Sequence, residues 1–313
     1  MIKKPYIAVV LLNYNSEEDL FISLKQINNQ KNINLITIII DNNSSEKTVK
    51  NIKKWSRNNI EKLNTFSKNK LDAKILNSEI NKNTKDTFII YNNENRGYSA
   101  GNNIGIKLAD YLNVDAVLIA NPDMRFENEK YIYELSKTLF SNKKYLLASS
   151  KIIGLDGKDQ SPLREASFYE EITWFRDLFP RIFKKTPYVL AYEKNKIITV
   201  PKVMGCCLLV KINFLREINY FDENTFLYSE EPILSAQVKQ KGGKIVFNPI
   251  IEAIHAHDKS QKGNSSKSML QFIKSRKYYL KKYSGYSYLK LVLLTISYSF
   301  LELLYSIKLK MFK

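Results

Sequence analysis

Two groups of acidic residues have the type and spacing that cation binding and proton transfer require. Asp123 ends the segment Asn121-Pro122-Asp123, which follows an apolar run, and a carboxylate there can bind a divalent cation that neutralises a diphosphate. Glu230 and Glu231 are adjacent, so one carboxylate can deprotonate the hydroxyl group of an acceptor molecule while its neighbour orients that molecule. Both patterns also have a structural explanation, because Asn-Pro-Asp forms ordinary turns and acidic pairs favour the first turn of a helix.

His255 and His257 are the two histidines of the chain, and one residue separates them. In an extended segment both side chains point the same way and can complete a metal site or contact phosphate. Lys259 and Ser260 follow and can add phosphate contacts. A structural or merely exposed histidine pair explains the same residues equally well.

Asp41 and the segment 95–105 are the candidate contacts for a nucleotide. Asp41 opens the polar sequence D-N-N-S-S after an apolar run, where it can contact a base or ribose or can form an Asx-turn before the next helix. The sequence N-R-G-Y-S-A-G-N-N-I-G at 95–105 has glycines that permit close approach of a ligand, or that pack a helix on a sheet. Its glycine spacing differs from G-x-G-x-x-G, which disfavours a dinucleotide-binding dehydrogenase.

The elements that must position these residues alternate between strand and helix. Buried strands are predicted at 6–12, 35–40, 87–91 and 116–120, and helices from Ser16, at 47–55 and at 97–112. This alternation predicts an α/β fold with a mostly parallel central sheet flanked by helices and with sites at the carboxyl ends of the strands. Residues 57–86 lack periodicity, and we expect a surface insertion there with room for one short helix.

The second half is less regular, and we expect it to shape the acceptor site. Strands are predicted at 146–153, 207–210 and 244–247, and helices at 230–241 and 266–282. Residues 288–312 are rich in Leu, Ile, Val and aromatics, but Lys290, Glu302 and Lys308 interrupt them. This pattern favours an amphipathic helix at a membrane interface over a spanning helix.

Composition narrows the class of protein. The 313 residues are 44% hydrophobic, which suits one elaborated α/β domain with a tail. The net charge of +18 attracts anionic partners such as nucleoside diphosphates or lipid headgroups, whereas the basic residues form no recognised nucleic-acid module, so we expect no nucleic acid as partner. The adjacent Cys206 and Cys207 indicate small core residues, and the N-terminus lacks a signal-peptide pattern, so we expect a cytoplasmic protein.

Seven segments, taken in order, resemble glycosyltransferase family 2, particularly its bacterial rhamnosyltransferase-like members. They are V-V-L-L-N-Y-N at 9–15, D-N-N-S-S at 41–45, N-R-G-Y-S-A-G-N-N-I-G at 95–105, N-P-D at 121–123, G-C-C-L-L-V at 205–210, F-L-Y-S-E-E at 226–231 and I-H-A-H-D-K-S at 254–260. The resemblance implies a GT-A-type fold with a Rossmann-like nucleotide-binding half. We expect a GT-A domain at 1–285, with a nucleotide-sugar half at 1–125 and an acceptor half at 126–285, and a membrane-associating helix at 286–313.

The resemblance also implies roles for individual residues. Asp123 would be the metal-binding acid of a D-x-D-like motif, with Mg²⁺ or Mn²⁺ as the cation and His255 as a further metal or diphosphate contact. Glu231 falls on the position of the catalytic base, and Glu230 would help to hold the acceptor. The implied nucleotide-sugar contacts are Asn13, Asn15, Asp41, Asn95, Arg96, Gly97, Gly101, Asn102 and Asn121. Further candidate contacts of the diphosphate or the acceptor are His257, Ser260 and Gly205.

These roles predict an inverting transfer of a sugar from dTDP-rhamnose or a UDP-sugar to a hydroxyl of a glycan or lipid-linked glycan. The reaction would serve surface polysaccharide biosynthesis at the inner face of the cell membrane. Asn121 replaces the first Asp of D-x-D, Glu231 stands where Asp is usual, and Ile233 stands where a third acid is frequent. These departures keep open a relative that binds the donor without consuming it, and a basic nucleic-acid-binding protein is the third interpretation.

Overall fold

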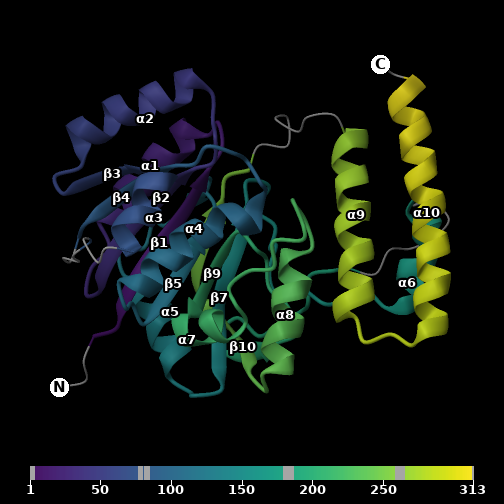
Figure 1. Ribbon diagram of the computed structural model, residues 1–313. Coiled ribbons are helices and arrows are strands. Elements are labelled where there is room, and N and C mark those ends of the chain that lie inside the picture. The colour runs from purple at the N-terminus through teal and green to yellow at the C-terminus, as the bar shows by residue number, and fades with distance from the viewer. Residues whose placement is uncertain (1–3, 77–79, 81–84, 179–186, 258–264, 312–313) are drawn as a thin grey trace.

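The computed structural model describes residues 4–76, 80, 85–178, 187–257 and 265–311, and in them one mixed sheet carries helices on both faces (Figure 1). The strands are β1 (Tyr6–Asn13), β2 (Asn34–Asp41), β3 (Leu63–Ser67), β4 (Thr87–Tyr91), β5 (Ala116–Ala120), β6 (Met124–Arg125), β7 (Tyr145–Gly154), β8 (Ile198–Val200), β9 (Cys207–Lys211) and β10 (Lys244–His255). Their order is β3-β4-β2-β1-β5-β9-β7-β10-β6, with β8 pairing to β10. The predicted α/β fold with a mostly parallel sheet is confirmed.

Helices connect the strands and extend beyond them. They are α1 (Glu17–Asn28), α2 (Glu46–Asn59), α3 (Lys68–Leu76), α4 (Tyr98–Tyr111), α5 (Tyr131–Phe140), α6 (Phe168–Ile172), the 3₁₀ turn η1 (Trp174–Leu178), α7 (Ile212–Glu217), α8 (Glu230–Gln240), α9 (Ser265–Tyr283) and α10 (Tyr288–Met311). The order of strands and helices in the first half follows the βα alternation predicted from the apolar runs.

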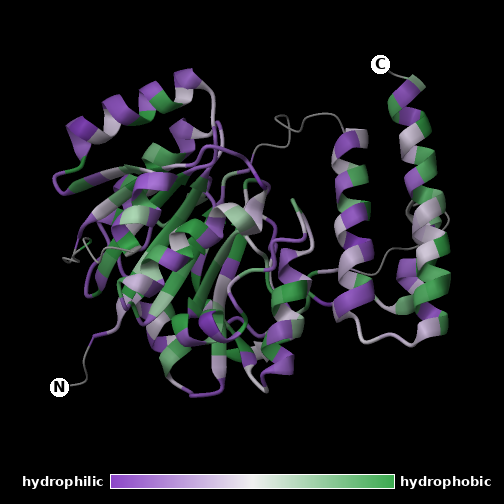
Figure 2. Cartoon of the chain, in the orientation of Figure 1, coloured by the Kyte–Doolittle hydropathy of each residue, from purple (hydrophilic) through white to green (hydrophobic). Residues whose placement is uncertain are grey.

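Two apolar cores cover the two faces of the sheet. Successive residues of a strand point to opposite faces, so Val10 packs under α4 while Val9 and Leu11 pack against α1 and α5. The strands are the most apolar part of the chain (Figure 2). Both cysteines are buried in this sheet region and unpaired, as predicted.

The parallel register brings polar residues to one edge of the sheet. Asn13 at the end of β1 pairs with Asp41 at the end of β2, and Asp41 pairs with Tyr91 at the end of β4. The end of β5, Ala120, lies beside Leu11. The loops that follow these strands therefore open on the same side of the molecule, where ligands of open α/β sheets bind.

The prediction for residues 57–86 was wrong in one respect. Part of this stretch forms β3, which pairs in parallel with β4 at the edge of the sheet, and α3 follows it. An edge strand is only half-buried, so Leu63–Ser67 includes the polar residues Asn64, Thr65 and Ser67 and lacks the continuous apolar run that identified its neighbours.

The helices α9 and α10 stand side by side next to the sheet (Figure 1). They share a third apolar cluster with α6 and with Ile233 of α8. Within this cluster the buried Arg276 of α9 pairs with Glu171 of α6, which also accepts a hydrogen bond from Tyr298 of α10. These contacts fix both long helices to the segment that contains α6.

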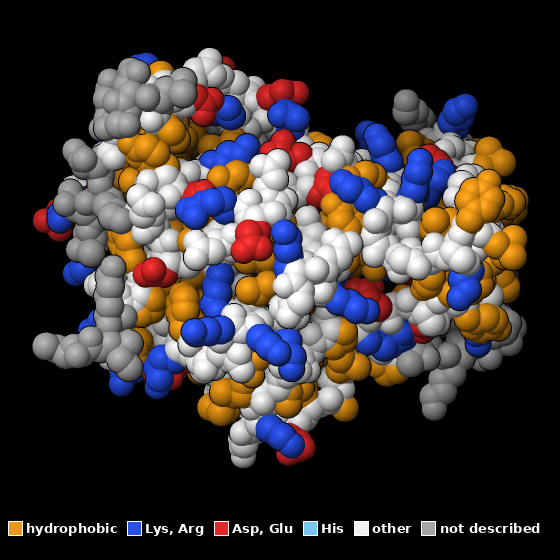
Figure 3. Space-filling view, turned by 60° about the horizontal axis from the view of Figure 1, so that its bottom comes forward, with side chains coloured by type: hydrophobic (Ala, Val, Ile, Leu, Met, Phe, Trp, Pro, Cys, Tyr) orange, Lys and Arg blue, Asp and Glu red, His pale blue; other side chains and the backbone are white. Residues whose placement is uncertain are grey.

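One side of α10 is apolar and exposed. Its exposed residues recur every three or four positions, at Leu289, Leu293, Ile296, Phe300, Leu303, Ile307 and Met311. Apolar side chains gather at that end of the molecule in Figure 3. Among the described residues, α10 is the one helix that is long and apolar enough to cross a membrane, with a mean hydropathy of 1.4.

Candidate functional site

A cavity of about 480 Å³ opens at the carboxyl edge of the sheet. It is lined by Leu12, Tyr14, Ser16, Asn42, Asn95, Gly97, Tyr98, Asn121, Pro122, Asp123, Phe226 and Leu227. These residues belong to the segments at 9–15, 41–45, 95–105, 121–123 and 226–231, apart from Ser16. Five segments distant in sequence thus converge on one cavity, whose volume is that of a small-molecule site.

Asn95, Gly97 and Asn121 are the predicted nucleotide contacts that line this cavity. Asn13 and Asp41 instead lie buried behind it, and the Asn13 Nδ2 group donates a hydrogen bond of 3.0 Å to Asp41 Oδ1. The other carboxylate oxygen of Asp41 accepts from the Ser44 N–H, three residues on, which is a local side-chain to backbone bond within the loop. Asp41 shapes the loop that carries Asn42 into the cavity.

Asn15 and Arg96 lie outside the residues that line the cavity. Asn15 is exposed, and its Oδ1 accepts from the Ser45 N–H at 2.9 Å, so it braces the start of α2. The Arg96 side chain is 62% exposed, with its guanidinium 3.7 Å from Glu223. Both side chains are at the surface.

Gly101 and Asn102 pack α4 against the rest of the fold. A Cβ on Gly101 would lie 2.5 Å from Leu12 Cδ1, so the absent side chain lets the helix approach β1. Asn102 is fully buried and donates to the Tyr98 carbonyl. The packing explanation of the segment 95–105 therefore holds for these two residues.

Unlike Gly101, which packs against β1, Gly97 lies against the loop before α8. Its φ is +98°, and a Cβ there would lie 2.1 Å from the Phe226 carbonyl oxygen. That carbonyl accepts a hydrogen bond of 2.8 Å from the Tyr98 N–H. Only glycine allows this contact, which joins the two walls of the cavity at the start of α4.

Asp123, His255 and His257 form a cluster at one end of the cavity. Their ligand atoms lie within 4.8 Å of one another, and both histidine nitrogens are 3.4 Å from Asp123 Oδ2. The two histidine rings stack on each other. His255 is the last residue of β10, and antiparallel pairing with β6 places it opposite Met124, next to Asp123 in the chain. The predicted metal residues Asp123 and His255 are thus brought together with His257, while Ser260 lies outside the described residues.

The hydrogen bonding of this cluster fits a cation. The Gln160 Oε1 atom lies 2.8 Å from His255 Nδ1. An amide oxygen only accepts, so Nδ1 donates to Gln160, and Nε2 is the nitrogen that faces Asp123 Oδ2. A proton or a metal cation between Nε2 and the carboxylate makes this approach favourable. Imidazoles suit transition-metal ions, and a carboxylate suits Mn²⁺ or Mg²⁺.

Asp123 itself has the electrostatics of a cation ligand. Its Oδ1 atom is buried and has no hydrogen-bond partner among the described residues. Burial opposes ionisation, but the hydrogen bond from His255 and the nearby His257 ring outweigh it and hold the pKa of Asp123 below its usual range. The carboxyl group is therefore charged at neutral pH, with one oxygen left to bind.

Glu231 is held beside the same cavity through Gly205. Its Oε1 atom accepts from the Gly205 N–H at 3.2 Å, and a Cβ on Gly205 would lie 2.8 Å from that oxygen. The Tyr98 hydroxyl, on the cavity wall, donates to the Gly205 carbonyl at 3.0 Å. The next residue, Cys206, accepts from the Asn121 N–H. One peptide segment thus links the wall of the cavity to the glutamate.

Glu230 is buried beside Glu231 at the start of α8. Burial, with the charge of Glu231, raises the pKa of Glu230 to about 8, and its Oε1 atom has no hydrogen-bond partner among the described residues. Tyr228 and Ser229, just before it, have φ values of 71° and 67°. Two consecutive left-handed residues without a glycine are strained, and such strain concentrates at functional sites.

Sequence reasoning missed several residues of the cavity wall, chiefly Asn42, Tyr98, Phe226 and Leu227. Asn42 and Tyr98 stand inside the segments that were singled out, and Phe226 and Leu227 begin the segment that ends in Glu231. Their neighbours were chosen for charge or for glycine, whereas these residues contribute an amide, a phenol and apolar surface. Exposure was the missing signal, since Phe226 is 45% exposed beside the cavity.

Comparison with known proteins gives the context of this site. No protein-family model matches the chain. It is 24% identical over 252 residues to the low-salt glycan biosynthesis hexosyltransferase Agl10 of Haloferax volcanii. The aligned region covers 80% of this chain and 66% of Agl10, so the chain spans just under two thirds of the length of that relative.

Two solved structures are similar in fold. The mannosyltransferase PcManGT of Pyrobaculum calidifontis, in complex with GDP-Man and Mn²⁺, superposes with a TM-score of 0.58 at 12% identity over 95% of this chain and 74% of its own. Residues 1–349 of S. aureus TarS, in complex with UDP-GlcNAc, superpose with a TM-score of 0.55 at 12% identity over 92% of this chain and 70% of that one. The chain therefore has the GT-A fold of glycosyltransferases and is a distant homologue of the archaeal hexosyltransferase Agl10.

Proposed function

We propose that this protein transfers a hexose from a nucleoside diphosphate sugar to a hydroxyl group of a glycan. The observation that carries the proposal is the cavity with the Asp123, His255 and His257 cluster at one end and Glu231, held by Gly205, beside its wall. A diphosphate needs positive charge and the acceptor hydroxyl needs a base, and this arrangement supplies both kinds of group within one site.

Asp123, His255 and His257 would hold Mg²⁺ or Mn²⁺, and the cation would neutralise the departing diphosphate. Two GT-A structures similar in fold, PcManGT and GalNAc-T7, contain Mn²⁺. Asn95, Asn42 and the exposed Phe226 offer amides and a ring face to the nucleoside. Replacing Asp123 by Asn should weaken Mn²⁺ binding measured by calorimetry, because the charged oxygen that lacks a partner is lost.

Glu231 would act as the base in an inverting single displacement. It would accept the proton of the acceptor hydroxyl while that oxygen attacks the anomeric carbon opposite the nucleotide, and the bond to the diphosphate breaks. Glu230, neutral at pH 7 because of its raised pKa, would donate a hydrogen bond that holds the acceptor. General base catalysis of this kind contributes roughly 10² to 10⁴ in rate.

The test is nucleotide release over a panel of UDP-, dTDP- and GDP-sugars, with Mn²⁺ or EDTA and with a lipid-linked glycan extract as acceptor. dTDP-rhamnose and UDP-sugars are the first donors to test, and GDP-mannose joins them because PcManGT binds GDP-Man. We expect turnover of one donor that EDTA abolishes. Donor binding without turnover across all acceptors would contradict transfer and would favour a relative that only binds the donor.

A matched pair of variants tests the base. Glu231→Gln should lower turnover by about 10²-fold or more while donor affinity changes less than about twofold, since Gln keeps the shape but cannot take the proton. The exposed Glu61→Gln serves as control. Equal loss of turnover and donor affinity in Glu231→Gln would remove Glu231 from the role of base.

We also propose that the protein works at the cytoplasmic face of a membrane, with the exposed side of α10 in the lipid interface. That side is an apolar stripe, and the chain has a net charge of +18, which attracts anionic headgroups. The other side of α10 carries polar side chains that form hydrogen bonds within the protein. Ser297 accepts a hydrogen bond from Trp174, and Glu302 accepts one from Lys277. Carrying these groups into hydrocarbon is costly, so a helix lying in the interface is favoured over a spanning one.

Vesicles of phosphatidylglycerol and phosphatidylcholine test this attachment by co-sedimentation. The double variant Ile296→Glu/Phe300→Glu should lose binding, while Ile22→Glu, at an exposed apolar position of α1, should retain it. Unchanged binding of the double variant would contradict the proposal. Light scattering on the same samples shows whether the stripe instead pairs two copies of the chain.

A further inference from the structure

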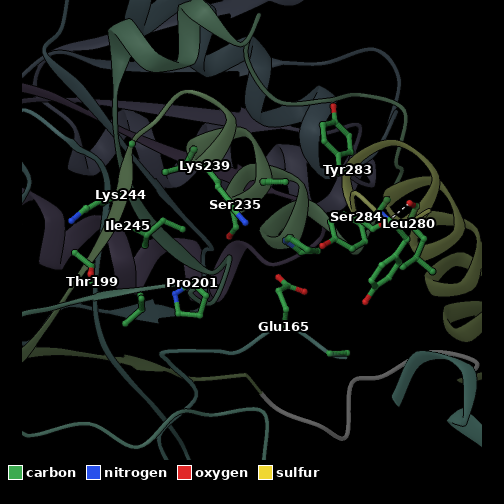
Figure 4. A pocket seen from close by; sticks show the side chains of 18 of the residues that line it. Glu165, Thr199, Pro201, Ser235, Lys239, Lys244, Ile245, Leu280, Tyr283 and Ser284 are labelled. Atoms are coloured by element: carbon green, nitrogen blue, oxygen red, sulfur yellow. Dashed lines mark hydrogen bonds between the residues drawn. The ribbon is translucent and has the colours of Figure 1, made fainter. Parts of the chain in front are cut away.

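A second cavity, of about 540 Å³, lies between α8, α9 and the start of β10 (Figure 4). Ser235 and Ala236 line it from α8, and Tyr279 and Tyr283 line it from α9. None of its lining residues lines the cavity at the carboxyl edge of the sheet, so the two are separate. The function proposed above makes no use of this space.

The side chains of this second cavity disfavour an apolar ligand. Glu165 points into it, with Pro201 on one side and Ser284 on the other (Figure 4). Lys202 Nζ lies 3.1 Å from one oxygen of Glu165, and Arg276 lies 3.8 Å from the other. Lys239, Lys244 and Arg276 also line the cavity, so its wall carries charges of both signs. Together with the hydroxyl of Ser235, these groups disfavour a purely apolar ligand such as a lipid tail.

The same side chains suit a neutral sugar. Carboxylate and hydroxyl oxygens accept hydrogen bonds from sugar hydroxyls, and tyrosine rings present flat apolar faces to the C–H side of a pyranose. The volume is within the range of sites that hold small molecules. Carboxylate, hydroxyl and tyrosine therefore stand together around a space of suitable size.

The position of the second cavity relates it to Glu231. Pro232, the next residue in the chain, lines it, so a single turn of α8 has the base on one side and this cavity on the other. A glycan acceptor of several sugars is longer than one helical turn, whose pitch is about 5.4 Å. Sugars remote from the accepting hydroxyl can thus reach the second cavity.

We propose that the cavity between α8 and α9 binds neutral sugar units of the acceptor glycan, away from the hydroxyl that is glycosylated. This inference rests on the proposed function, since it assigns a second subsite to the same acceptor. Binding energy from such remote sugars positions the reacting hydroxyl, which is how non-reacting parts of a substrate contribute to rate.

Two substitutions of matched size on α8 test the subsite. Ala236→Trp fills the cavity, whereas Gln240→Trp adds the same indole at an exposed position outside its lining. The probe is an array of neutral bacterial oligosaccharides of two to six sugars, read with the full chain. We expect wild type and Gln240→Trp to bind the same oligosaccharides, and Ala236→Trp to bind them at least tenfold more weakly.

Binding of nucleotide sugars by calorimetry separates this inference from the proposed function. Ala236→Trp should bind the donor as wild type does, because the donor cavity is elsewhere. If Ala236→Trp unfolds, Lys239→Trp, at an exposed residue on the rim, replaces it. Equal array binding by wild type and the filled variant, or no array binding by wild type, would overturn the subsite, whereas failure of donor binding in wild type would overturn the proposed function.

Discussion

Replacing Glu230 by Gln should stabilise the protein, and increasingly so as the pH rises. Burial, with the charge of Glu231, raises the pKa of Glu230 from 4.5 to about 8. Between these values the folded protein holds a proton that the unfolded chain has lost, so stability is complete at low pH and falls as the pH rises through this window. Each pH unit is worth about 1.4 kcal/mol, which gives a loss of about 3 kcal/mol from pH 5 to pH 7. Gln cannot ionise and has no such loss.

Urea titrations of wild type and Glu230→Gln at pH 5, 6, 7 and 8 measure this difference directly. We expect the variant's advantage in unfolding free energy to grow by about 3 kcal/mol from pH 5 to pH 7 and to level off above about pH 8. The exposed Glu61→Gln should show a constant difference over the same range. A difference between Glu230→Gln and wild type that does not change with pH would refute the reasoning, because Glu230 would then ionise alike in the folded and unfolded states.

The remaining predictions concern groups that hold the site together. Tyr98→Phe should cost about 1–3 kcal/mol and lower kcat more than donor affinity, because the Gly205 carbonyl loses its partner; denaturation and nucleotide release measure the two effects. Gly97→Ala should destabilise the fold by about 1–3 kcal/mol, since its φ is +98° and the new Cβ meets the Phe226 carbonyl. Arg276→Ala should cost about 3–5 kcal/mol in urea titrations, because it leaves the buried Glu171 carboxylate without its cationic partner.

The sequence predicted the long buried strands, and it missed the edge strand β3 and the short strands β6 and β8. The strand at Thr87–Tyr91 was predicted at its observed bounds because its residues form a continuous apolar run. Leu63–Ser67 was missed, since an edge strand needs only one apolar face and its pattern resembles that of a loop. Local patterns therefore reveal burial, and an element with little burial leaves little trace.

In the candidate site, the charged residues were predicted from the sequence, but the residues that they contact were not. Asp123 and His255 were paired by residue type, and β10 brings them together across the sheet. The contact between Glu231 and Gly205 and the hydrogen bond from Tyr98 to that glycine join three distant segments, and no local pattern encodes such a contact. Asp41 was predicted to contact the nucleotide, but its carboxylate instead accepts a hydrogen bond from the loop that follows its strand. A carboxylate at the end of a strand can hold the loop or bind a ligand, and the sequence does not distinguish the two.

The helix α9 contacts both the loop before α8 and the apolar helix α10. Its Ser275 donates to the carbonyl of Leu227, which lines the cavity at the carboxyl edge of the sheet, and its Tyr278 and Tyr283 donate to Asp222 in the loop before α8. The opposite side of α9 packs on α10. Deleting α10 would therefore expose the packing surface of a helix that also holds the loop before α8, and a loss of activity would not separate membrane contact from the position of that loop. Substitutions on the exposed stripe leave that packing intact, which is why they are the sharper test of the membrane proposal.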